Sequence, residues 1–98
     1  MNKTYLKSKK GVVKVTFEVT PEVETRQAAV VGEFNNWNPT ATPMKRKKDG
    51  SFSVALNLES AKQYRYKYYL DGQRWMTDPH ADASIPNIFG SQDSVLVV

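Results

Sequence analysis

Two tryptophans, Trp37 and Trp75, have the sequence surroundings best suited to a chemical task. Trp37 lies in the segment FNNWNP (residues 34–39), and a loop of three asparagines ending in proline cannot easily bury an indole. An exposed aromatic face can pack against the C–H groups of a pyranose ring, while amide and ammonium groups donate hydrogen bonds to the sugar hydroxyls. Asn36 stands beside Trp37, so this pattern is typical of sugar binding. The opposing interpretation, that the tryptophans cap the hydrophobic core, is equally compatible with their spacing.

The position of Trp75 depends on the register of a hairpin that turns at Asp71-Gly72. A two-residue turn pairs Tyr68 with Trp75 and places the indole on the face of the alternating tyrosines. A three-residue loop with a bulge pairs Tyr69 with Trp75 instead, on the same face as Lys67. Only the second register gives a sugar site. The sugar-binding hypothesis therefore predicts a longer or bulged turn, with its glycine at positive φ and Trp75 partly exposed.

Catalytic groups are sparse in this sequence. His80 is the single histidine and has no second ligand at metal-binding spacing, so we expect a solvated loop residue. Asp78 and Asp82 flank it, but aspartates in such loops usually cap turns. The chain has no cysteine, which excludes disulfides, thiolate zinc sites and cysteine nucleophiles. We expect no enzymatic activity, no metal and no cofactor.

Length and composition indicate one small soluble domain. The chain has 98 residues, of which 40% are hydrophobic and 24% charged, as in ordinary folded proteins. No apolar run approaches the roughly 18 residues of a membrane span, and residues 1–11 lack the apolar core of a signal peptide. We therefore expect a cytoplasmic protein without membrane contact. The net charge of +4 permits nucleic-acid binding, but the basic cluster at 45–48 has no interleaved aromatics, so we expect none.

Strands must position these residues, because apolar and polar side chains alternate with period two along most of the chain. The segment 27–33 is apolar on both faces at residues 28–31 and is predicted to be a central strand. The irregular segment 77–93 is predicted to be either a functional loop or a crossover between sheets. Residues 1–11 are predicted to be a flexible basic arm, followed by the domain at 12–98. The other predicted strands cover 13–19, 44–48, 51–58, 64–70 and 94–98. Seven or so short strands describe a β-sandwich.

Several motifs in this chain resemble those of a known family. They are VVGEFNNW at 30–37, Met44, YKYYLDG at 66–72, WMTDP at 75–79 and FGSQDSV at 89–95. Together they resemble the glycogen- and starch-binding modules of carbohydrate-binding module family 48, which are found before isoamylases and branching enzymes and in the β-subunit of AMP-activated kinase. The resemblance runs from about residue 12 to 98 and implies an all-β, early-set immunoglobulin-like sandwich.

The resemblance also implies a site for an α-1,4-linked glucan. In that family two tryptophans and a lysine commonly hold the glucan, and they fall here on Trp37, Trp75 and Lys67. The bulky apolar residue of the last loop falls on Phe89, and the family's asparagine position is occupied by Asp93. A carboxylate accepts hydrogen bonds but cannot donate them, so Asp93 is a departure from the pattern. Asn36 and Tyr69 complete the candidate carbohydrate-binding residues.

The expected function is non-catalytic recognition of glycogen or starch chains, which would target or regulate a glycogen-metabolising enzyme. With no catalytic domain in view, we expect the module to act alone, as a dimer or docked onto such an enzyme. The alternative is a protein-interaction module that kept the scaffold and lost the sugar. Asp93 favours this alternative, and burial of Trp37 or Trp75 would support it.

Overall fold

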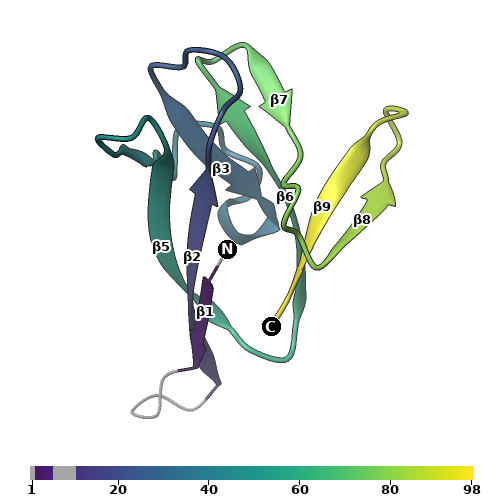
Figure 1. Cartoon of the computed structure of the whole chain (residues 1–98). Helices are drawn as coiled ribbons and strands as arrows, with labels where there is room; N and C mark the ends of the chain where they lie inside the picture. The colour runs from purple at the N-terminus through teal and green to yellow at the C-terminus, as the bar shows by residue number, and fades with distance from the viewer. Residues whose placement is uncertain (1, 6–10) are drawn as a thin grey trace.

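The structure, a computed structural model, describes residues 2–5 and 11–98. These residues form nine β-strands and one short 3-10 helix, and they include no helix long and apolar enough to cross a membrane. The strands lie in two antiparallel sheets that form the two layers of a sandwich (Figure 1). The predicted all-β, immunoglobulin-like sandwich is confirmed, with two more strands than the seven or so expected.

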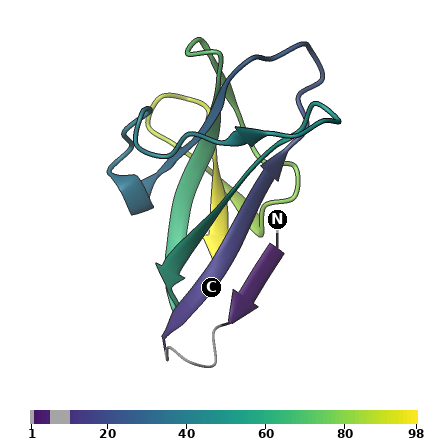
Figure 2. The same ribbon diagram turned by 90° about the vertical axis from the view of Figure 1, so that its left-hand side faces the viewer.

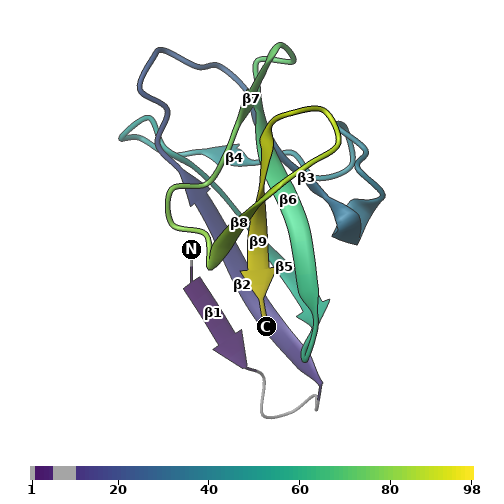
Figure 3. The ribbon, with the colours of Figure 1, turned by 90° about the vertical axis from the view of Figure 1, so that its right-hand side faces the viewer.

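One layer is a four-stranded sheet, in front in Figure 2, with the order β1-β2-β5-β4. Its strands are β1 (Asn2–Tyr5), β2 (Val12–Val19), β4 (Lys45–Arg46) and β5 (Phe52–Glu59). The other layer, in front in Figure 3, has the order β3-β6-β9-β8, and β7 also pairs with β6. Its strands are β3 (Ala28–Gly32), β6 (Gln63–Leu70), β7 (Arg74–Met76), β8 (Ala83–Pro86) and β9 (Gln92–Val97). The 3-10 helix η1 (Glu33–Asn35) follows β3.

The core lies between the two sheets and follows from the period-two pattern of β2 and β6. Every second residue of β2, from Val13 to Val19, is buried and faces the other layer. On β6 the inward residues Tyr66 and Tyr68 are fully buried, and Phe17 packs edge-on against Tyr66 with ring centroids 5.2 Å apart. Because side chains alternate along a strand, Lys67 and Tyr69 must then lie on the outer face of the five-stranded sheet.

The strand β3 lies at an edge of its sheet, so the prediction of a central strand was wrong. All five of its residues are buried. The edge is covered by the loop before β4: Val30 N donates to Thr42 O at 3.2 Å, and Met44 N donates to Ala28 O at 2.8 Å. A sheet edge can be satisfied by a covering loop as well as by a strand, and apolar residues on both faces do not distinguish the two.

Two segments expected to be irregular contain strands. β8 lies inside 77–93 and forms a hairpin with β9 in the same sheet, so this segment is not a crossover between sheets. Asn2–Tyr5, expected in the flexible arm, pairs antiparallel with β2. The free edge of β2 offers backbone N–H and C=O groups to any extended segment, so pairing requires no apolar pattern there. The rest of the predicted arm up to residue 10 lies outside the described residues.

Candidate functional site

The hairpin between β6 and β7 has the register that a sugar site requires. Tyr69 pairs with Trp75 and Leu70 pairs with Arg74, so three residues form the turn. Gly72 has φ 63°, in the left-handed region that glycine adopts without steric cost. The predicted longer turn is confirmed, and it places Trp75 on the outer face with Lys67 rather than in the core.

Trp37 and Trp75 line one groove, with a volume of about 440 Å³, on the outer face of the five-stranded sheet. The complete lining is Trp37, Lys67, Trp75, Asn87, Phe89, Ser91 and Asp93. Trp37 is 37% exposed, Trp75 51% and Phe89 86%, and neither tryptophan belongs to the hydrophobic core. The interpretation of the tryptophans as core caps was therefore wrong, because both rings are accessible to a ligand.

The loop after β3 holds Trp37 in place. Asn36 and Trp37 both have φ 57°, a left-handed conformation that is unfavourable for a bulky side chain and costs on the order of 1–3 kcal/mol per residue. Asn35 braces this loop, since its side-chain amide donates to Val30 O at 3.0 Å and its oxygen accepts from Gly32 N at 3.1 Å. Trp37 N also donates to Gly32 O at 2.9 Å. Asn36, predicted to be a sugar ligand, is exposed but does not line the groove.

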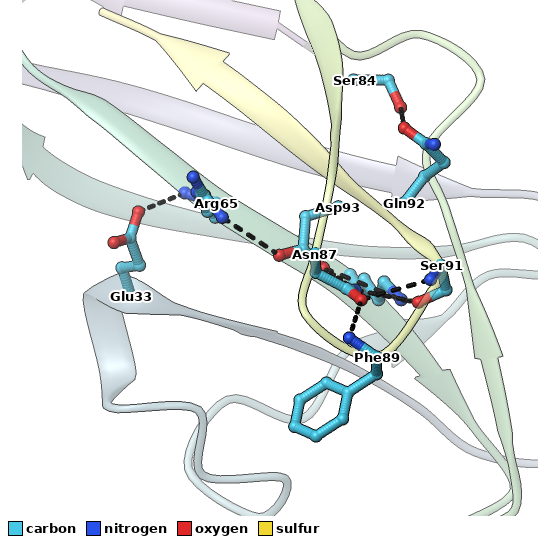
Figure 4. A network of polar contacts seen from close by, with 9 residues as sticks. Glu33, Arg65, Ser84, Asn87, Phe89, Ser91, Gln92 and Asp93 are labelled. Atoms are coloured by element: carbon cyan, nitrogen blue, oxygen red, sulfur yellow. Dashed lines mark hydrogen bonds and ion pairs between the residues drawn. The ribbon is translucent and has the colours of Figure 1, made fainter.

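Polar side chains form the floor of the groove. Lys67 lies on β6 with its side chain only 13% exposed, and its Nζ donates to Ser91 Oγ at 2.9 Å. Asn87 Nδ2 donates to the same hydroxyl at 2.8 Å, while Asn87 Oδ1 accepts from Phe89 N at 2.9 Å. Figure 4 shows the Phe89 ring projecting away from this network. The loop between β8 and β9 therefore presents an apolar ring above a hydrogen-bonded floor.

Asp93 is placed inside this network rather than on the groove's open surface, with only 6% of the residue exposed. Its Oδ1 accepts from Asn87 Nδ2 at 3.0 Å and lies 3.7 Å from Lys67 Nζ. Its Oδ2 lies 3.9 Å from Arg65 Nη1 (Figure 4). Two cations and an amide thus surround the carboxylate. An acceptor-only group suits this position, because the nearby atoms of Lys67, Arg65 and Asn87 are all donors.

Tyr69 stacks against Trp75, its partner across the two strands. The two rings have centroids 4.3 Å apart at an interplanar angle of 32°, and Tyr69 Oη donates to Gly72 O at 2.6 Å. Tyr69 does not line the groove, unlike the other predicted residues of β6 and β7. The stack fixes the orientation of the exposed indole, and contact of Tyr69 itself with a sugar stays a prediction.

Asn87 and Ser91 line the groove but were missed by the sequence reasoning. Asn87 accepts from the backbone of both Phe89 and Ser91, the pattern by which an asparagine stabilises a tight turn. The segment NIFGS at 87–91 carries that signal, since asparagine is followed three residues later by glycine. The signal predicts the turn, but it does not reveal that the turn folds over Lys67.

Asp78 and His80, which lie between β7 and β8, do not line the groove. Asp78 is buried, its Oδ1 accepts from His80 N at 2.9 Å, and its Oδ2 accepts from Tyr66 and Tyr68 hydroxyls at 2.7 and 2.9 Å. Burial, followed by the nearby Asp78 carboxylate, raises the pKa of both phenols well above the usual value. His80 itself is exposed. Within residues 2–5 and 11–98, no group of three or more acidic or histidine side chains could hold a metal ion.

The groove thus combines three exposed aromatic rings with ammonium, hydroxyl and amide groups, and this arrangement suits a ligand with apolar faces and many hydroxyls. A family model described as the glycogen recognition site of AMP-activated protein kinase matches residues 5–98, which include the whole groove. A comparison with curated proteins found no match.

Proposed function

The chain belongs to the family of the glycogen recognition site of AMP-activated protein kinase, and from this premise we propose that it binds an α-1,4-linked glucan by stacking sugar rings on Trp37 and Trp75. One observation carries the proposal: the two exposed indoles line the same groove as Lys67. Trp37 comes from the loop after β3 and Trp75 from β7, so the fold brings together rings that are far apart in sequence. The module is non-catalytic in this proposal.

The expected affinity is modest. About half of the surface of the Trp75 residue is exposed, so on the order of 100 Å² is open to a sugar. Covering half to all of it at about 25 cal/mol per Å² would contribute roughly 1–2.5 kcal/mol. Hydrogen bonds to Lys67 and Ser91 contribute less, because they replace hydrogen bonds to water. Stacking therefore supplies most of the binding free energy.

The proposal includes a role beside an enzyme. Recognition of glycogen without catalysis is useful when it brings a glycogen-metabolising enzyme to its substrate or regulates the enzyme there. Self-association into a dimer would give the same module two contacts with one polysaccharide.

The competing function, a protein-interaction module that lost the sugar, is not favoured by the site. Its supporting observation would be burial of Trp37 or Trp75, and both are accessible.

Titration with maltoheptaose, β-cyclodextrin and glycogen tests the proposal by calorimetry and by tryptophan fluorescence. Both tryptophans of the chain line the groove, so fluorescence reports on the site directly. We expect Trp37→Ala and Trp75→Ala each to weaken binding about 10- to 100-fold, consistent with roughly 1.4–2.8 kcal/mol.

The control variant is Val97→Ala, which truncates an exposed apolar side chain of β9 that does not line the groove. It should bind as the unaltered protein does. Cellohexaose, whose glucose units are β-linked, serves as the control ligand. Absence of binding to all three α-glucans at millimolar concentration would refute the proposed function.

A further inference from the structure

A second hollow, of about 540 Å³, lies at the β3 edge of the sandwich, next to the Tyr69–Trp75 stack. Its lining includes Ala29 of β3, Tyr69 of β6 and Gly72 of the following turn. In the sheet, Tyr69 has Trp75 on one side and Ala29 on the other. Trp75 belongs to the first groove and Ala29 to the second hollow. The stacked rings of Tyr69 and Trp75 therefore form the boundary between the two.

The hollow results from a small residue between two larger neighbours. Ala29 pairs with Tyr69 on one side and forms an isolated bridge with Pro43 on the other. Because outward side chains in register lie side by side, the methyl group of Ala29 leaves an open space between the Tyr69 ring and Pro43. The fold thus leaves one side of an already fixed aromatic ring facing this space.

The chemistry of the hollow resembles that of the first groove. Tyr69 supplies an aromatic surface whose orientation is fixed by its stack on Trp75 and by its hydrogen bond to Gly72 O. Arg26 and Arg46 supply guanidinium donors, and no acidic residue lines the hollow. Neither guanidinium forms an ion pair with another residue of the described ranges. Hydrogen bonds from the Gln27 and Arg26 backbone lower the pKa of the nearby Asp71 carboxylate, and the charge of Arg26 contributes to this lowering. Both guanidinium groups can donate to hydroxyl groups of a ligand.

We propose that this hollow is a second subsite for the same glucan, which accepts a further segment of the chain beyond Trp75. The inference rests on the proposed function of the first groove. Continuity through the Tyr69–Trp75 stack identifies the occupant, because Trp75 lines the first groove and Tyr69, the ring stacked on it, lines the hollow. The apolar wall of Pro43 and Met44 also suits a sugar face better than a small anion. The module then prefers long α-glucan chains to short ones.

The test compares maltotetraose with maltodecaose by calorimetry, using the double variant Arg26→Gln/Arg46→Gln. We expect the unaltered protein to bind maltodecaose at least 5-fold more tightly than maltotetraose. The double variant should keep its affinity for maltotetraose and lose most of the preference for the longer chain. Lys45→Ala, next to Arg46 but outside the hollow, is the matched control. A long chain offers the same number of overlapping binding positions to every variant, so this statistical advantage does not change with the substitutions. A lost preference for maltodecaose therefore reports on the hollow.

A second measurement follows the backbone amide NMR signals of Ala29 and Gly72, which should shift with maltodecaose and not with maltotetraose. The second subsite is refuted if the double variant keeps the preference, or if both sugars shift the same amides. In either case maltotetraose still binds at Trp37 and Trp75, so the proposed function stands. If neither sugar binds the unaltered protein, the proposed function fails and the subsite fails with it.

Discussion

Asp93→Asn is the substitution that best tests how the groove is built. The change preserves the shape of the side chain and the oxygen that accepts from Asn87. It removes the negative charge that lies 3.7 Å from Lys67 Nζ and 3.9 Å from Arg65 Nη1. It also replaces one oxygen by an NH2 group, which brings a donor toward groups that only donate.

The magnitude follows from the burial of the pair. The side chains of Lys67 and Asp93 are only 13% and 9% exposed. At an effective dielectric constant near 20, two unit charges at this separation attract by about 4 kcal/mol before desolvation is counted. Arg65 is 45% exposed and adds little, because solvent screens it. Lys67 keeps its hydrogen bond to Ser91, so we expect a net loss of about 1–3 kcal/mol in the free energy of unfolding.

Thermal and urea unfolding measure this loss, which corresponds to a decrease in Tm of roughly 4–20 °C for a domain of this size. A double-mutant cycle with Lys67→Met isolates the pair. If Asp93 neutralises Lys67, then Asp93→Asn costs at least about 1 kcal/mol less in the Lys67→Met background. We also expect Asp93→Asn to weaken glucan binding several-fold, because Lys67 and the loop at 87–91 lose a shared anchor.

Two results would refute this reasoning. Additive effects in the cycle would show that Asp93 does not act through Lys67. Tighter glucan binding by Asp93→Asn at an unchanged Tm would show that the side chain faces the ligand, where an amide can donate to a hydroxyl, and not the cations of the floor.

Two further predictions concern the scaffold. The raised pKa values of Tyr66 and Tyr68 keep both phenols neutral in the folded state, whereas in the unfolded state they ionise above about pH 10. The stabilisation should therefore be fully present below about pH 10. Above it, the free energy of unfolding should fall by about 1.4 kcal/mol per pH unit for each phenol. Urea unfolding from pH 8 to 11.5 measures the slope, and an unchanged slope in Tyr66→Phe would contradict this origin. Gly32→Ala should destabilise the fold by more than about 2 kcal/mol, because the new methyl group would lie 2.5 Å from a carbonyl oxygen of β6. Gly90→Ala meets no atom within 4 Å and should cost only about 1 kcal/mol of backbone strain, so equal losses would contradict the steric argument.

The sequence alone determined the features that depend on local chemistry. Period-two alternation predicted β2, β5 and β6 with their buried faces, because side chains of a strand alternate whatever the strand pairs with. The asparagine-rich loop predicted an accessible Trp37, since the same few residues fix both the turn and its exposure. The turn at Asp71-Gly72 left two registers open, and only the requirement of a sugar site favoured the three-residue loop that the structure has.

Only the tertiary structure decided which segments lie side by side. β3 is buried at a sheet edge because a loop from later in the chain covers it, and β1 exists because β2 offers a free edge. Asp93 is buried in the floor of the groove because Lys67 and Asn87, far apart in sequence, bring their donors to one point. The burial of such a charged side chain depends on distant partners, and their positions are a property of the folded chain rather than of any local pattern.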